Sequence, residues 1–207
     1  MKTLKLFLVL SFFFTLSGYS SEPIPDSTND YLITISTQYG DMKMILFDDT
    51  PKHKKNFVKL AKAGVYDHII FHRVIDHFMI QTGDFKTRNK ERNYDVTIIP
   101  QSVPAEIKDH HKHAYGSVAA ARRGDKVNPE RKSSGTQFYI VENKKGTPHL
   151  DGKYTVFGQV MSGLSVIDSV AAQPTSERDS PKQDIRMTVK VEKVKRENVE
   201  KFYNFEY

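Results

Sequence analysis

A single arginine, Arg73, lies within a dense apolar stretch that runs from Phe71 to Phe85. Arginine is almost never fully buried without a partner, because an unpaired buried charge is strongly destabilising. Arg73 is therefore expected either to pair with an acid such as Asp84 inside the fold, or to lie at the edge of an apolar pocket. If the stretch is extended, alternation places Met79 and Gln81 on one face. A thioether beside an amide suits an apolar ligand that also carries a peptide group.

Two later stretches also predict strands. The segment Ser134–Val141 is rich in β-branched and aromatic residues, which predicts a strand with Gln137 and Tyr139 on one side. The segment Leu150–Val160 predicts a tight turn followed by another strand.

Four motifs follow one another along the chain, namely FHRVI, FMIQTGDF, SSGTQFYIV and LDGKYTVFGQV. In this order the chain resembles the cyclophilin-type peptidyl-prolyl cis–trans isomerases, and the resemblance covers residues 31–194. It implies an all-β fold, a closed eight-stranded antiparallel barrel capped by two short helices. It also implies an enzyme without cofactor or metal, which accelerates rotation about X–Pro bonds in proline-containing peptides or unfolded proteins.

The resemblance also implies roles for individual residues. Arg73 would donate a hydrogen bond near the prolyl nitrogen, and Gln81 would orient Arg73 and bind the substrate backbone. The proline pocket and the peptide groove beside it would be lined by Phe78, Met79, Ala121, Arg122, Gln137, Tyr139, His149, Leu150 and Tyr154. Judged from the residues alone, Phe78, Met79 and Leu150 fit ordinary core packing equally well.

The sequence departs from the best-known eukaryotic cyclophilins at three of these positions. His149 stands where their motif has tryptophan, Tyr154 where it commonly has histidine, and Tyr139 where it commonly has phenylalanine. The first change touches the face that receives cyclosporin, so we expect this drug to bind weakly.

Histidines suggest two other kinds of chemistry. His72 is adjacent to Arg73, but the reaction transfers no proton, so a histidine hydrogen-bonded within the barrel is the favoured interpretation. Residues 109–113 read Asp-His-His-Lys-His, which suggests either a metal site or a solvated loop. Their spacing fits no fixed ligand geometry, so we expect no metal there.

The N-terminal residues predict export. Residues 1–21 combine Lys2 and Lys5 with an apolar run and a small-residue cleavage pattern, as in a signal peptide, and an uncleaved membrane anchor is the alternative. Residues 22–30 predict a linker, residues 31–194 the isomerase domain and residues 195–207 a tail of no clear period. The protein is thus expected in the periplasm or outside the cell, with no stable membrane span once the leader is removed.

Within the domain, further elements are predicted. Two β-rich runs, 31–37 and 42–47, predict a hairpin, and Thr50-Pro51 predicts the start of a helix that ends at Gly64. A second helix is expected over residues 164–171, and alternation over 185–192 predicts a strand with one buried face.

Composition narrows the function. The formal charge of +6 is spread along the chain, which favours solubility over nucleic-acid binding, and the absence of cysteine excludes disulfides and thiol nucleophiles. We expect a monomer that isomerises X–Pro bonds in exported proteins. The alternative is a proline-peptide binding module or holdase with little turnover, and the pairing of Arg73 with Gln81 favours the enzyme.

Overall fold

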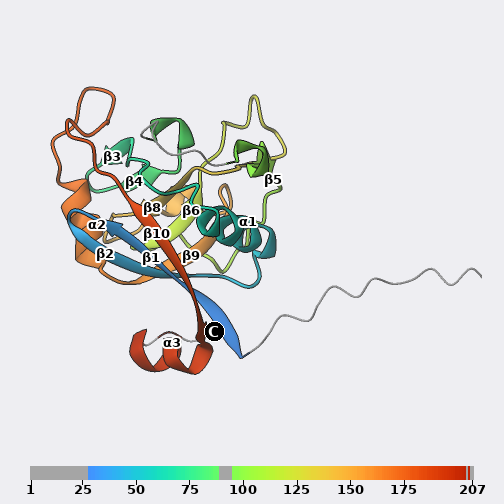
Figure 1. Cartoon of the computed structure of the whole chain (residues 1–207). Coiled ribbons are helices and arrows are strands. Elements are labelled where there is room, and N and C mark those ends of the chain that lie inside the picture. Colours follow the sequence, from blue (N-terminus) through green and yellow to red (C-terminus); the bar gives the residue numbers. More distant parts are fainter. Residues whose placement is uncertain (1–27, 89–94, 204, 206–207) are drawn as a thin grey trace, which may run out of the picture.

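The computed structural model describes residues 28–88, 95–203 and 205 of the chain (Figure 1). The expected signal peptide, 1–21, and residues 22–27 of the expected linker lie outside the described residues. Among the described helices, none combines the length and the apolar character needed to cross a membrane.

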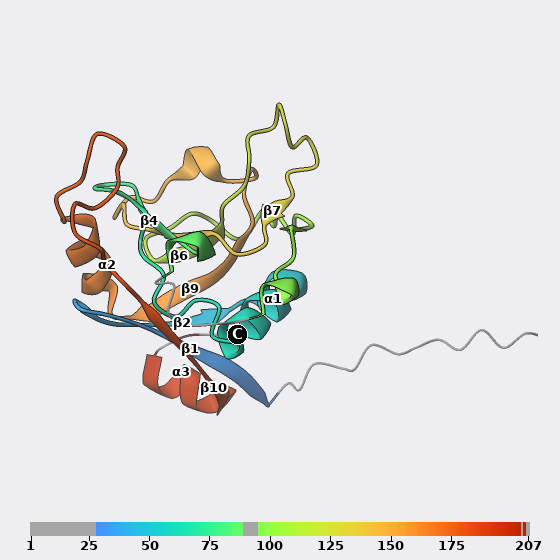
Figure 2. The same cartoon turned by 45° about the horizontal axis from the view of Figure 1, so that its top comes forward.

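An antiparallel sheet of eight strands forms the body of the fold, in the order β10-β1-β2-β9-β6-β8-β4-β3 (Figures 1 and 2). Its strands are β1 (Asn29–Thr37), β2 (Gly40–Leu46), β3 (Arg73–Ile75), β4 (Met79–Thr82), β6 (Ser117–Ala120), β8 (Phe138–Val141), β9 (Val156–Ser162) and β10 (Thr188–Lys195). Two short strands, β5 (Ser102–Val103) and β7 (Ser133–Ser134), form a separate pair. Ahead of β3 and β10, the amide of Phe71 donates to the carbonyl of Ile185 at 2.9 Å, and that of Met187 to Ile69 at 3.0 Å.

The main core lies between this sheet and two helices, α1 (Pro51–Lys62) and α2 (Leu164–Ala171). Alternation in β1 buries Ile33 and Ile35, while α1 contributes Phe57 and Leu60 to the same core. The hairpin, both of these helices and the buried positions Ile185, Met187 and Val189 confirm the corresponding predictions. A mostly β fold is thus confirmed.

The start of α1 differs from the expected arrangement. Thr50 makes no side-chain cap, and its hydroxyl instead donates to the carbonyl of Phe47 at 3.2 Å. The carboxylate of Glu106 accepts the amides of Lys52 and His53, each at 3.0 Å. A distant acid therefore satisfies the free amides of the first turn, and its negative charge suits the helix N-terminus.

The predicted strand over residues 134–141 is wrong in its continuity, since β7 and β8 are separate strands with different partners. The break falls at Gly135, where an added Cβ would lie 1.7 Å from the carbonyl oxygen of Pro100. Only glycine allows this close backbone approach.

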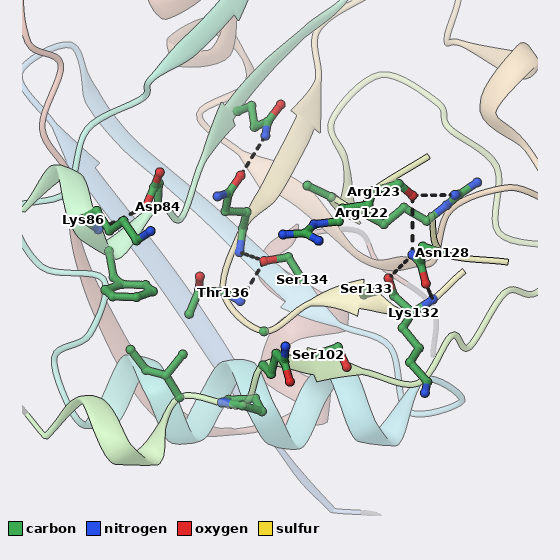
Figure 3. Close-up of a pocket in the computed structure, with 18 of the residues that line it drawn as sticks. Asp84, Lys86, Ser102, Arg122, Arg123, Asn128, Lys132, Ser133, Ser134 and Thr136 are labelled. Atoms are coloured by element: carbon green, nitrogen blue, oxygen red, sulfur yellow. Dashed lines mark hydrogen bonds between the residues drawn. The ribbon is translucent and has the colours of Figure 1, made fainter. Parts of the chain in front are cut away.

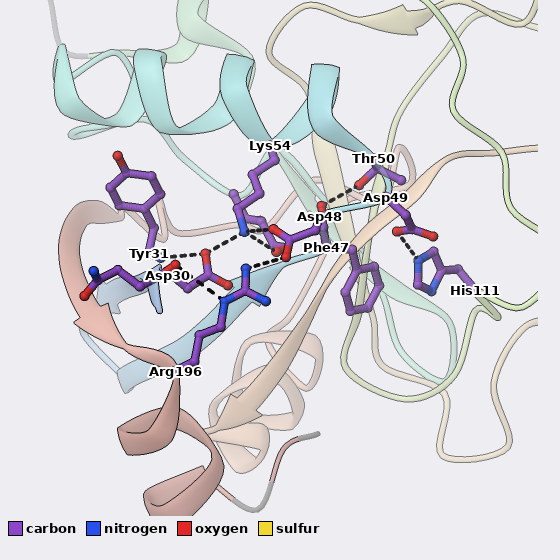
Figure 4. Close-up of polar contacts among 11 residues, drawn as sticks. Asp30, Tyr31, Phe47, Asp48, Asp49, Thr50, Lys54, His111 and Arg196 are labelled. Carbon is purple, nitrogen blue, oxygen red and sulfur yellow. Dashed lines mark hydrogen bonds and ion pairs between the residues drawn. The ribbon is translucent and has the colours of Figure 1, made fainter. Parts of the chain in front are cut away.

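A third helix, α3 (Arg196–Tyr203), corrects the expectation of two helices. It buries only Val199, which explains why residues 195–207 show no apolar period. Its first residue, Arg196, contacts Asp48, and Lys54 contacts both Asp48 and Asp30 (Figure 4). Asp30 is buried in β1, so this strand begins inside the segment expected to be linker.

Candidate functional site

The predicted catalytic pair lies on the sheet face opposite the main core. Arg73 on β3 is the cross-strand partner of Gln81 on β4, and Gln81 is that of Tyr139 on β8. Tyr139 is paired in turn with Ala119 on β6. Cross-strand partners share a face, so these residues form one row across four strands.

A second apolar cluster, separate from the main core, lies along this row. Its buried members are Met79, Ala119, Tyr139, Val141 and Val156, and partly buried Phe47, Ile75, Phe78, Ala121, Leu150 and Tyr154 pack against them. We call this set the outer cluster. It brings together six of the residues predicted to line the pocket or groove, namely Phe78, Met79, Ala121, Tyr139, Leu150 and Tyr154. None of the six belongs to the main core, because strand alternation turns Met79 outward and Ile80 inward.

Arg73 does not pair with Asp84. Its Nε lies 3.4 Å from Oδ2 of Asp179, and the two side chains are 44% and 43% exposed. Asp179 lies in the loop between α2 and β10 with a φ of 60°, and its carbonyl accepts the amide of Val74 at 2.7 Å. The guanidinium therefore stands at an open edge, held from one side by an acid that sequence analysis did not identify.

Gln81 reaches towards the groove. Its Nε2 donates to Oε1 of Gln137 at 3.2 Å, so the two predicted amides lie together, although Gln137 precedes β8 and does not lie on a strand. Gln81 is half-buried and is the cross-strand partner of Arg73.

The side chain of Arg122 is buried and hydrogen-bonded within the fold, although it was predicted to line the peptide groove. Its side chain is 4% exposed, its Nε donates to the carbonyl of Lys153 at 2.7 Å, and its guanidinium lies 4.5 Å from the ring of Tyr154. It also pairs with Asp125. Arg122 thus fixes Tyr154 against the outer cluster and tethers the loop that follows β6.

A cavity of about 820 Å³ adjoins the outer cluster and shares Gln81, Ala121, Arg122 and Gln137 with the predicted site. Figure 3 shows Asp84 and Lys86 on one side of it and Arg123, Asn128 and Lys132 on the other. None of the outer-cluster aromatic residues Phe78, Tyr139 and Tyr154 lines this cavity. The cavity therefore extends the groove beyond them and gives an extended peptide room on that side.

A hydrogen-bonded histidine supports the floor of the outer cluster. The ring of His113 contacts Oδ1 of Asp151 through Nδ1 at 2.8 Å and the hydroxyl of Tyr139 through Nε2 at 3.0 Å. Burial lowers the pKa of His113 and outweighs the opposing hydrogen bond to Asp151. The neutral ring can then donate to Asp151 and accept from Tyr139. Sequence analysis assigned His113 to a solvated loop, since its two partners lie far along the chain.

His149 and His72 occupy different settings. His149 is exposed and its ring stacks on Phe78 with centroids 5.8 Å apart. Burial lowers the pKa of His72, against the raising effect of Asp84. Its Nδ1 is buried and has no hydrogen-bond partner among the described residues, so the expected hydrogen-bonded ring is wrong at this atom.

Comparison with known proteins agrees with this arrangement. The model for the family "Cyclophilin type peptidyl-prolyl cis-trans isomerase/CLD" matches residues 32–191. Peptidyl-prolyl cis-trans isomerase CYP18-1 of Arabidopsis thaliana is 39% identical over 157 residues, which cover 75% of this chain and 91% of that protein. A putative bifunctional phosphatase/peptidyl-prolyl cis-trans isomerase of Streptococcus pyogenes is 36% identical over 181 residues, and the chain spans only 37% of its length.

A solved structure also matches. It is that of a cyclophilin type peptidyl-prolyl cis-trans isomerase of Cryptosporidium parvum in the presence of the dipeptide Ala-Pro, with a TM-score of 0.66 and 27% identity. The match covers 78% of this chain and 98% of that one. Sequence motifs, fold and relatives therefore agree that the chain belongs to the cyclophilin-type peptidyl-prolyl cis–trans isomerase family.

Proposed function

We propose that this protein catalyses cis–trans rotation about X–Pro bonds in proline-containing peptides and unfolded proteins. The observation that carries the proposal is the row in which Arg73 and Gln81 adjoin the outer cluster. An apolar, aromatic surface suits the prolyl ring, and the half-exposed guanidinium stands where a peptide on that surface can meet it.

The chemistry requires no covalent step. Amide resonance creates a rotational barrier of about 18–20 kcal/mol. In the twisted transition state this resonance is lost, and the prolyl nitrogen gains an available lone pair. A hydrogen bond from Arg73 to that nitrogen stabilises the twisted state and not the planar one, which is the condition for catalysis. Gln81 would hold the substrate backbone while Gln137 holds Gln81.

The competing function is peptide binding with little turnover. Both functions predict that a proline tetrapeptide binds the outer cluster, but only the enzyme accelerates exchange. The test is the cis–trans exchange rate of such a tetrapeptide, measured by NMR with catalytic amounts of the full chain. We expect the exchange rate to increase in metal-free buffer. If the peptide binds but its exchange rate does not change, and circular dichroism shows that the protein is folded, the protein is a peptide-binding module and not an isomerase.

The closed barrel and the export of the protein are further parts of the proposal. Hydrogen bonds between residues 68–71 and 185–187 support closure between the two edges of the sheet. Lys2, Lys5 and the apolar run that follows support export. Fusing residues 1–30 to a reporter that is active only in the periplasm tests export in a bacterial host, and a silent fusion would contradict it.

The protein is also proposed to act as a monomer. The row with Arg73 and Gln81 and the outer cluster beside it are assembled within the fold of a single chain, which supports this proposal. Sedimentation of the purified protein should give the mass of one chain, and a concentration-independent dimer would contradict the proposal.

A further inference from the structure

Three side chains with metal-binding atoms meet on the side of the fold where β2 passes into α1. Nε2 of His110 lies 2.8 Å from Oδ2 of Asp49, and Nε2 of His111 lies 2.7 Å from Oδ1 of the same carboxylate. One atom from each of the three residues lies within 4.8 Å of the other two. We propose that Asp49, His110 and His111 bind a divalent late transition-metal ion, of which zinc is the representative. This reverses the expectation drawn from the spacing of residues 109–113, because the third ligand, Asp49, lies 61 residues from His110.

The donor set suits such an ion. Imidazole nitrogen favours zinc, copper and nickel, and a carboxylate oxygen is a common third ligand of zinc. Zinc bonds of about 2.0–2.1 Å in a tetrahedron place neighbouring ligand atoms about 3.3 Å apart. The two contacts with Asp49 are 2.8 Å and 2.7 Å long, so each needs to open by about 0.5 Å to admit the ion. Small side-chain rotations supply that change, and the fourth position remains open to water.

Two of the three ligands are held in place before any ion binds. The ring of His111 stacks on Phe47 with centroids 4.0 Å apart and an interplanar angle of 13° (Figure 4). Asp49 follows Phe47 in a turn that the amide of Thr50 closes on the carbonyl of Phe47. The same short segment therefore orients both the carboxylate and one imidazole.

Charge also favours a cation at this position. Both oxygens of the Asp49 carboxylate face imidazole nitrogens, and the carboxylate is 37% exposed, so an acidic group stands at the centre of the three side chains. An entering ion would replace the two imidazole protons that now satisfy it.

A second group of candidate ligands, Asp76, His77 and Glu142, serves as an internal comparison. It offers one imidazole and two carboxylates, a weaker set for zinc than two imidazoles. The structure therefore favours the Asp49 site for zinc.

Zinc would connect distant parts of the chain. Asp49 and His110 are 61 residues apart, and the ion would link the β2–α1 turn to the segment that leads into β6. Binding to the folded state alone raises its stability, so zinc at about 100 times its Kd should raise Tm by roughly 5–10 °C. Calcium and magnesium, which prefer oxygen ligands, should leave Tm unchanged.

The experiment uses the full chain without an affinity tag, freed of metal by chelator and dialysis. Zinc is titrated in competition with a chromophoric chelator, in parallel with the variants His110→Ala and His111→Phe. The second variant retains an aromatic ring against Phe47 while removing the ligand. One zinc per chain is expected, with affinity at least tenfold weaker in each variant. His77→Asn is the matched control and should bind zinc like the natural protein.

Three results would overturn the proposal. They are no zinc binding at tens of micromolar, unchanged affinity in both variants, and loss of binding in His77→Asn with retention in His110→Ala. Circular dichroism distinguishes loss of the ligand from loss of the fold. Cobalt provides an independent measurement, since its visible absorption should report a tetrahedral site in the natural protein and disappear in His111→Phe.

Discussion

Replacing Arg73 by lysine tests the proposed mechanism most directly. The planar guanidinium offers several donors in a fixed fork, whereas lysine offers a compact, strongly hydrated charge on a flexible stem. In the structure Nε of Arg73 lies 3.4 Å from Asp179, while the same side chain stands in register with Gln81. A fork can keep Asp179 with one nitrogen and reach the prolyl nitrogen with another. A single ammonium group cannot contact both Asp179 and the prolyl nitrogen.

The size of the effect follows from the exposure of these groups. A hydrogen bond that involves a charged group contributes about 1.5–3 kcal/mol, which corresponds to a loss of about 10- to 150-fold in kcat/KM if it acts only in the transition state. The ion pair with Asp179 is less important, because both side chains are more than a third exposed. Exposed pairs contribute about 0.2–1 kcal/mol, so Asp179→Asn should cost at most about fivefold.

The assay is kcat/KM for a proline tetrapeptide beside the Kd of the same peptide. Arg73→Lys should reduce kcat/KM at least tenfold and change Kd less, because the outer cluster that holds the ring is intact. Asn tolerates the positive φ of Asp179, so Asp179→Asn is a matched control that retains the loop. Equal losses in kcat/KM and affinity would show that Arg73 only holds substrate. Full activity in Arg73→Lys would remove it from the mechanism.

Three other outcomes are expected. Cyclosporin should inhibit weakly, and His149→Trp should tighten inhibition about tenfold by adding an indole beside Phe78, so potent inhibition of the natural protein would contradict the role of this position. Burial lowers the pKa of His53 from 6.5 despite its contact with Glu106. The folded state then binds fewer protons than the unfolded chain, and the free energy of unfolding should fall as pH drops below about 6.5. Urea unfolding at pH 7.5 and 5 should show a smaller fall for His53→Gln, and an equal fall would assign the effect elsewhere. Activity should be nearly constant between about pH 6 and 8, since Arg73 stays charged, whereas a bell-shaped profile would indicate a proton transfer.

Local periodicity predicted the parts of the site that lie on strands. The period of two correctly placed Met79 and Gln81 on one face of β4, whereas the contact between Gln81 and Gln137 was not predicted. The apolar stripe of α1 followed from residue spacing in the same way. These features depend on residues close together in the sequence, where the side-chain direction is set by the backbone.

Contacts between distant residues were not predictable in this way. Arg73 and Asp179 are 106 residues apart, and Asp179 lies in a loop with no pattern that points to a partner. The same holds for Glu106 at the start of α1 and for Asp151 beside His113. In each case one acid among the 25 in the chain is selected by tertiary folding alone. The helix α3 escaped detection for another reason, because it buries a single side chain and so leaves no stripe.

The first and last elements of the described fold lie beside each other. Their position determines which side of the protein would carry an attachment through the N-terminus. The amide of Arg196, at the start of α3, donates to the carbonyl of Thr28 at 3.0 Å. In both views β1 lies between α3 and β4, the strand that carries Gln81 (Figures 1 and 2). A chain held by its N-terminus would therefore be attached beside α3, on the side of β1 away from Gln81. Tethered in this way, the protein would keep access to passing chains without having to detach.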